Sequence, residues 1–160
     1  MYYAKSVDST LLVALGTISS QQVKATTATN RDVVQLFDYC ATHPDAVLRY
    51  RASDMILKIH SDSSYLNELK ARSRSGGHLY LGDKADNKSD VNNGALLTTS
   101  QVVRNLMSSA AEAECGALFN NAKQAVPLHI SLEEMGHPQP PTPIQVDNST
   151  AAGFANHQIN

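Results

Sequence analysis

A change in the spacing of apolar residues restricts the fold more than any other feature of the sequence. Three short segments rich in branched apolar residues lie between residues 55 and 99, and one long helical segment follows them. The first segment is Met55–His60, and Gly76-Gly77 and Asn93-Gly94 introduce the other two as pairs typical of turns. Strands joined by turns pair antiparallel, and a helix that crosses back adds a further strand to the sheet. The sequence therefore predicts an α/β domain with a mixed sheet.

The helical pattern is clear on both sides of these strands. Apolar residues at helical spacing predict two helices within residues 1–50, the second capped by Asn30 and ended by His43-Pro44. The long segment after the strands runs from about Ser109 to Met135, and Pro127 is expected to kink or split it.

The rest of the chain adds a stop, a connector and one more strand. Gly136 is expected to end the long helix, and residues 137–143 are rich in proline and predict an extended connector. Ile144–Asp147 is expected to form a strand, with a final helix starting after it. We therefore expect a helical segment over residues 1–50 and an α/β domain over residues 51–160.

Composition excludes several classes of protein. The chain has 160 residues, 42% of them hydrophobic, which is enough for a core without disulfides, and it has only two cysteines. No stretch approaches the roughly 18 apolar residues of a membrane span, and no secretory leader opens the chain, so we expect an intracellular protein with no membrane partner. The net charge of -2 argues against nucleic-acid binding by bulk positive charge, so such binding would need a local basic patch.

Acidic residues stand at the ends of the predicted elements. Asp62 closes the first predicted strand and Asp147 closes the last one, and ligands gather at the carboxyl ends of strands in open α/β sheets. Glu114 shares a helical stripe with small apolar residues and is expected to face the sheet. With Ser109 as the N-cap of its helix, Glu112 is expected to return its carboxylate to the N-cap amide, which gives it a structural role.

Three acids brought together would repel one another. A buried or half-buried carboxylate is rare unless it is paired or binds a metal, so a divalent cation would resolve the repulsion between Asp62, Glu114 and Asp147. Because all the ligand atoms would be oxygens, the predicted ion is Mg²⁺ or Mn²⁺ and not zinc.

Four motifs follow one another along the chain. They read HSDSSY (His60–Tyr65), RSRSGGHLYLG (Arg72–Gly82), SSAAEAE (Ser108–Glu114) and QVDNS (Gln145–Ser149). With them the chain resembles the polyprotein of copia-type long-terminal-repeat retrotransposons, across the end of the reverse transcriptase and most of the ribonuclease H domain. Residues 1–50 resemble the helices that join polymerase to nuclease. Each motif alone is a weak signal, but four in the family's order over nearly the whole chain are a strong one.

This resemblance implies a fold, an activity and a set of site residues. The fold would be a ribonuclease H-like mixed sheet with crossing helices, C-terminally incomplete because its last strand and helix are lacking, and preceded by the helical segment. The activity would be hydrolysis of the RNA strand of RNA/DNA hybrids by two metal ions. Asp62, Glu114 and Asp147 match three of the family's four catalytic, metal-binding acids. The fourth acid lies beyond a further strand in the family, and this chain stops at Asn160, so we expect weak or no cleavage.

The resemblance also implies partners and a location. The implied partners are an RNA/DNA hybrid and the rest of the polyprotein. The implied location is the cytoplasm, with virus-like particles as an alternative. In the alternative interpretation, the chain is a catalytically silent fragment, or a module that binds the hybrid without cleaving it, like the connection region of reverse transcriptases. Lys70, Arg72 and Arg74 are expected in a loop, where they are either solvated surface charges or contacts to the nucleic-acid backbone.

Overall fold

The computed structural model describes residues 2–84 and 92–157, which divide into two compact units. The units are Met1–Arg49 and Tyr50–Asn160, and each is described by itself. The first unit is helical throughout. Its elements are α1 (Tyr2–Ser6), η1 (Ser9–Leu11), α2 (Leu12–Ser20), η2 (Gln22–Lys24) and α3 (Thr27–Thr42). A small core holds them together around Ala4, Leu11 and Leu12.

The longest helix of the first unit starts earlier than predicted. Thr26, and not Asn30, is the N-cap of α3, because the Thr26 hydroxyl accepts the Thr29 N–H while the Thr29 hydroxyl contacts the Thr26 amide in return. This reciprocal capping box lies in a threonine-rich segment, Thr26–Thr29, just before the predicted cap. The predicted end is confirmed, since α3 stops at Thr42 with His43 as its C-cap.

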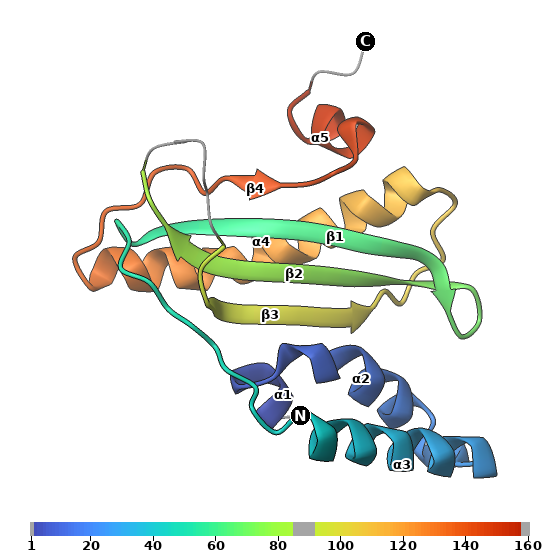
Figure 1. The fold of residues 1–160 in the computed structure, drawn as a ribbon. Coiled ribbons are helices and arrows are strands. Elements are labelled where there is room, and N and C mark those ends of the chain that lie inside the picture. The colour runs from blue at the N-terminus through green and yellow to red at the C-terminus, as the bar shows by residue number, and fades with distance from the viewer. Residues whose placement is uncertain (1, 85–91, 158–160) are drawn as a thin grey trace. The chain divides into compact units, whose positions relative to one another are not determined.

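The second unit is built on a four-stranded sheet in the order β3-β2-β1-β4 (Figure 1). The strands are β1 (Ile56–Glu68), β2 (Arg72–Gly82), β3 (Ala95–Val102) and β4 (Ile144–Gln145). The pairs β1–β2 and β2–β3 are antiparallel, and β1–β4 is parallel. The predicted α/β fold with a mixed sheet and crossing helices is thus confirmed, and its topology is consistent with a ribonuclease H-like domain.

Strands β1 and β2 form a longer hairpin than the sequence predicted. Gly76-Gly77 lie inside β2 and not in a turn, and the chain reverses over residues 69–71, where Lys70 and Ala71 have positive φ angles. As a result, Arg72 and Arg74 are strand residues, so the prediction of a basic loop was wrong for these two. Tertiary packing explains Gly77, because β2 passes close under the Asn121 side chain of a helix at this point.

That helix is α4 (Ala110–Glu134), which crosses one face of the sheet (Figure 1). It continues through Pro127, so the predicted split was wrong. Pro127 is exposed, and buried residues on both sides of it, Ala125 and Leu132, hold the helix on the sheet. The predicted stop is confirmed, since Gly136 follows with a φ of 87°, a conformation that glycine adopts without strain.

The core lies between α4 and the sheet. Alternate residues of the strands face the helix, and the buried cluster consists of Leu57, Ile59, Leu79, Ala125 and Leu132. Asn121 of α4 is fully buried beside this cluster and is held by three hydrogen bonds. Its amide nitrogen donates to Ser61 Oγ (2.9 Å) and to the Gly76 carbonyl (2.8 Å), and its oxygen accepts from Thr99 Oγ1 (2.9 Å).

The outer edge of β1 is completed by the connector that follows α4. Gln139 Oε1 accepts the Leu57 N–H (2.9 Å) and Gln139 Nε2 donates to the Met55 carbonyl (2.8 Å). The Pro143 carbonyl then accepts the Ile59 N–H (3.1 Å), and β4 begins at the next residue. A strand of only two residues is therefore enough to continue the sheet edge. The short helix α5 (Ser149–Ala155), capped by Asn148, comes after it.

We predict that Gly77→Ala destabilises the protein. A Cβ at position 77 would collide with the Asn121 side chain and with Thr99 Oγ1 at 2.6 Å, so the buried Asn121 side chain or its helix would have to move. The expected loss is about 1–3 kcal/mol of unfolding free energy, typical of overpacking, measured by urea denaturation. Gly76→Ala is the matched control, because its Cβ would meet nothing closer than the Asp62 carbonyl oxygen at 3.7 Å. Equal stability of the two variants would contradict this account.

Candidate metal centre

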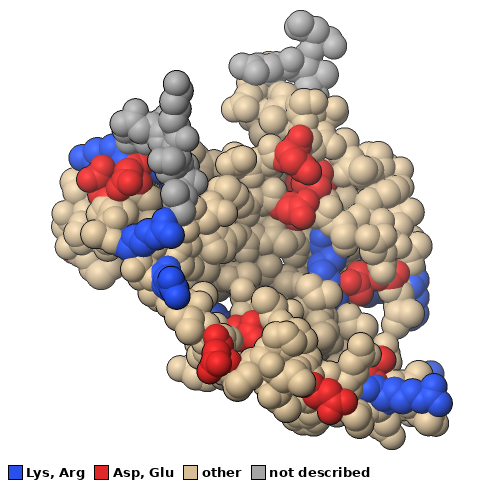
Figure 2. Space-filling view, viewed as in Figure 1, with Lys and Arg blue, Asp and Glu red and all other residues tan. Residues whose placement is uncertain are grey.

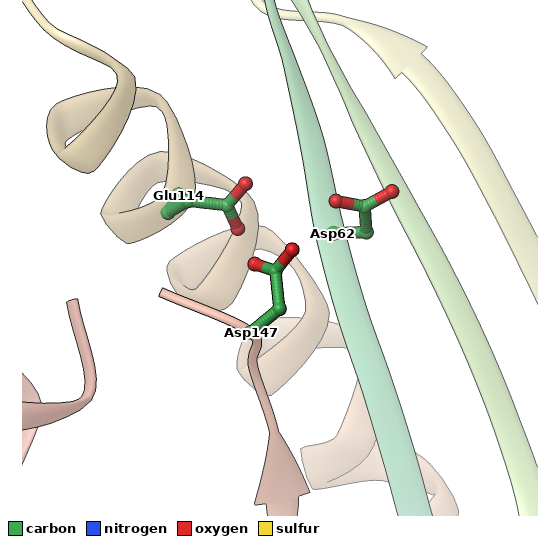
Figure 3. Close-up of side chains that lie close together, drawn as sticks. All are labelled: Asp62, Glu114 and Asp147. Carbon is green, nitrogen blue, oxygen red and sulfur yellow. The ribbon is translucent and has the colours of Figure 1, made fainter. Parts of the chain in front are cut away.

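Three elements bring three acidic side chains together beside the middle of β1 (Figure 3). The prediction that Asp62 closes its strand was wrong, because β1 continues beyond it to Glu68. In the parallel pairing of β1 with β4, His60 lies opposite Gln145. Asp62 and Asp147 both lie two residues beyond that pair, so they emerge side by side. Glu114 comes from the second turn of α4, which packs against β1. One carboxylate oxygen from each of the three acids lies within 4.8 Å of the other two.

Glu114 is the buried member of this cluster. The residue is only 6% exposed, whereas Asp62 and Asp147 are exposed. Its Oε1 accepts two hydrogen bonds from one residue, the backbone N–H (3.0 Å) and the hydroxyl (2.8 Å) of Ser63. Its Oε2 is buried and has no hydrogen-bond partner among the described residues. A carboxylate oxygen in this position normally needs a donor or a cation.

The raised pKa of the Glu114 carboxyl group also indicates that the charged group needs a donor or a cation. Burial raises the pKa of its carboxyl group above the usual 4.5, the Ser63 hydrogen bonds lower it in part, and the negative charges of Asp62 and Asp147 raise it further. A cation among the three carboxylates would remove both the burial penalty and the repulsion. Three oxygen donors suit Mg²⁺ or Mn²⁺, so the residues present fit the ion that the sequence predicted.

Glu112 lies outside the cluster, as predicted. Ser109 is the N-cap of α4 and accepts the Glu112 N–H at 3.1 Å. The Glu112 carboxylate does not return to the Ser109 amide, however, and instead accepts the N–H and the hydroxyl of Ser108, both at 2.6 Å. These bonds lower the pKa of the Glu112 carboxyl group. Glu112 thus has the structural role that the sequence predicted, but its carboxylate binds Ser108 and not the predicted Ser109 amide.

The basic residues named from the sequence have different environments. Lys70 is exposed at the tip of the β1–β2 hairpin and Arg72 is half-buried. Arg74 is 7% exposed, its Nε lies 2.6 Å from Glu68 Oε1, and its Nη1 donates to Ser100 Oγ (3.0 Å). Its main contact is therefore an internal ion pair. On the face shown in Figure 2, basic side chains are scattered among acidic ones and form no continuous patch over the described residues.

Sequence reasoning missed Ser63 and Asn121. A strand turns alternate residues to the same face, so Ser61 and Ser63 both follow Ile59 toward α4. Two serines on the helix-facing side of a strand, opposite Glu114 and Asn121 on the helix, are the signal that could have identified these contacts.

Comparisons with protein-family models, with curated proteins and with solved structures give no match for this chain. Among the described residues, no helix is long and apolar enough to cross a membrane. The site is therefore interpreted from its own geometry.

We predict that Glu114→Gln stabilises the metal-free protein at neutral pH. A raised pKa means that the folded state favours the protonated carboxyl group. The penalty of the charged form is therefore absent well below pH 4.5, develops as pH rises and is complete above the raised pKa. Glutamine keeps an oxygen for Ser63 and carries no charge. The gain in unfolding free energy, measured by urea denaturation without divalent ions, should shrink as the pH is lowered from the raised pKa toward 4.5.

Glu112→Gln is the matched control and should change stability in the opposite direction. The pKa of Glu112 is lowered, so its charged form stabilises the fold above pH 4.5 and this contribution is lost as pH falls through the lowered pKa. Glu112→Gln should thus be less stable than the parent at neutral pH. Two variants with shifts of the same sign would contradict the assignment of the two glutamates.

Proposed function

We propose that this chain is the ribonuclease H part of a copia-type retrotransposon polyprotein, hydrolysing the RNA strand of RNA/DNA hybrids. The observation that carries the proposal is the buried, unpartnered Oε2 of Glu114, in a carboxylate grouped with two further acids beside β1 of a ribonuclease H-like sheet. The four motifs in the family's order add independent support from the sequence. In this proposal the chain acts within its polyprotein in the cytoplasm.

Asp62, Glu114 and Asp147 would hold Mg²⁺ or Mn²⁺. When bound, such ions lower the pKa of a water ligand and neutralise charge on the phosphate oxygens. The chain's own part is to keep three negative groups in fixed places. Two of them, Asp62 and Asp147, are exposed and so can be reached by a nucleic-acid strand, whereas Glu114 anchors the cluster from inside.

Hybrid recognition in this proposal rests on the backbone and not on base sequence. A net charge of -2 leaves no general attraction for phosphates, so local contacts must supply it. Lys70 and Arg72 in the β1–β2 hairpin are the candidates. The ion pair with Glu68 makes Arg74 a support of that hairpin.

We predict that the three acids bind Mn²⁺ and that Asp62→Asn and Asp147→Asn weaken this binding. The loss should exceed about tenfold, because even residues that only support a metal ligand are worth about 10- to 100-fold in affinity. Isothermal titration with Mn²⁺ measures it, and cleavage of an end-labelled RNA/DNA hybrid with Mn²⁺ tests the activity. Glu112→Gln, two residues from Glu114, should leave Mn²⁺ affinity unchanged.

Two results would contradict the proposal at different levels. Absence of Mn²⁺ binding would remove the metal site itself. Hybrid binding that needs no Mn²⁺ and is unchanged by Asp62→Asn would favour the alternative of a hybrid-binding module.

A second prediction concerns the nucleic-acid interface. Replacing Lys70 and Arg72 by glutamine should weaken hybrid binding at every sequence and flatten the plot of log affinity against log salt, by about one unit for each phosphate that the protein no longer neutralises. Fluorescence anisotropy at several salt concentrations measures the slope. Lys24→Gln with Arg31→Gln removes the same charge from exposed positions of the helical unit and should leave the slope unchanged. Equal slopes for both double variants would place the nucleic acid elsewhere.

A further inference from the structure

We infer that Ser63 is a positioning residue for the metal centre, fixing the orientation of the Glu114 carboxylate beside Asp62 and Asp147. This role rests on the metal site proposed above and goes beyond it, since Ser63 is not a ligand. Its backbone N–H and its hydroxyl both donate to the same oxygen, Glu114 Oε1, at 3.0 and 2.8 Å. The other oxygen is thereby left for the site.

The two donors matter because a carboxylate is loosely oriented by itself. The last torsion of a glutamate side chain is broad and roughly two-fold, so rotation would exchange the two oxygens or turn both away from the site. Two donors from one residue define a single orientation. Hydrogen bonds to an ionised acceptor are also stronger than those between neutral groups, so this contact is well suited to the task.

The strand places Ser63 for this contact. The same N–H of Ser63 also lies 2.8 Å from Asp62 Oδ1, so this residue contacts two of the three acids. Two residues earlier on the same face, Ser61 accepts a hydrogen bond from Asn121, two helical turns beyond Glu114. Both serines therefore join β1 to α4. They differ in what they hold, since Ser61 meets a neutral amide and Ser63 meets the buried carboxylate of the site.

This difference supplies a matched control. Ser63→Ala removes the hydroxyl donor to Oε1 and leaves only the backbone N–H, so the carboxylate gains freedom to rotate. Ser61→Ala removes an equivalent hydroxyl from the same strand face, and Asn121 keeps its bonds to the Gly76 carbonyl and to Thr99. Ser63→Thr retains the hydroxyl oxygen and should restore what Ser63→Ala loses.

The experiment measures Mn²⁺ affinity of the full chain by isothermal titration, and unfolding by urea without metal. We expect Ser63→Ala to weaken Mn²⁺ binding about 10-fold or more, within the range for residues that orient metal ligands. Ser61→Ala should keep the parent's affinity, and Ser63→Thr should recover most of it. In the Glu114→Gln background, Ser63→Ala should have no further effect on the residual affinity of Asp62 and Asp147.

Failure of this inference can be distinguished from failure of the metal site. If the parent binds Mn²⁺ and Ser63→Ala binds it equally well, Ser63 has no positioning role and the metal site stands. If Ser61→Ala and Ser63→Ala lose affinity in proportion to their loss of stability, the role of Ser63 is structural only. If the parent binds no Mn²⁺, the site and the role of Ser63 are both overturned.

Discussion

The close packing of α4 on β1 and β2 is the constraint on which the rest of this domain depends. Helix α4 can pack closely on the sheet because Gly77 has no side chain at the place where the buried Asn121 amide lies. Asn121 then satisfies its polar atoms on three different strands, which fixes the helix along and across the sheet. Glu114 lies two turns before Asn121, so the same packing that orders the core places a carboxylate against Ser63 in the middle of β1.

The second half of the site depends on a very short stretch of parallel pairing. Strand β4 has only two residues, yet it sets Asp147 beside Asp62. It can do so because the connector before it already follows β1, with the Gln139 side chain bonding the β1 backbone as a strand would. A side-chain amide thus replaces part of the main-chain pairing. The position of Asp147 in the cluster therefore depends on Gln139, which lies outside the cluster.

Sequence reasoning succeeded where a local pattern and the final structure agree. Two strand-like runs followed by aspartate, and a helical stripe that includes Glu114, were enough to predict the mixed sheet and the acids that the structure brings together, although Asp62 lies within β1 and does not end it. It failed where tertiary contacts override a local signal. Gly76-Gly77 resemble a turn but lie inside β2, where Gly77 allows close packing under α4, and Pro127 resembles a break but lies in a helix held on both sides. Burial of Arg74 against Glu68 depends on a hairpin register that no local pattern shows.

The features of Glu114 that would suit a bound cation also lower the stability of the metal-free fold. A buried carboxylate with one unpartnered oxygen, close to two more acids, lowers the stability of the metal-free fold. Its neighbours offset this without neutralising it, because Ser63 binds one oxygen only and no described cation lies against the other. The three carboxylates could therefore hold a metal ion, and the polar contacts of Asn121 and Gln139 support the surrounding fold.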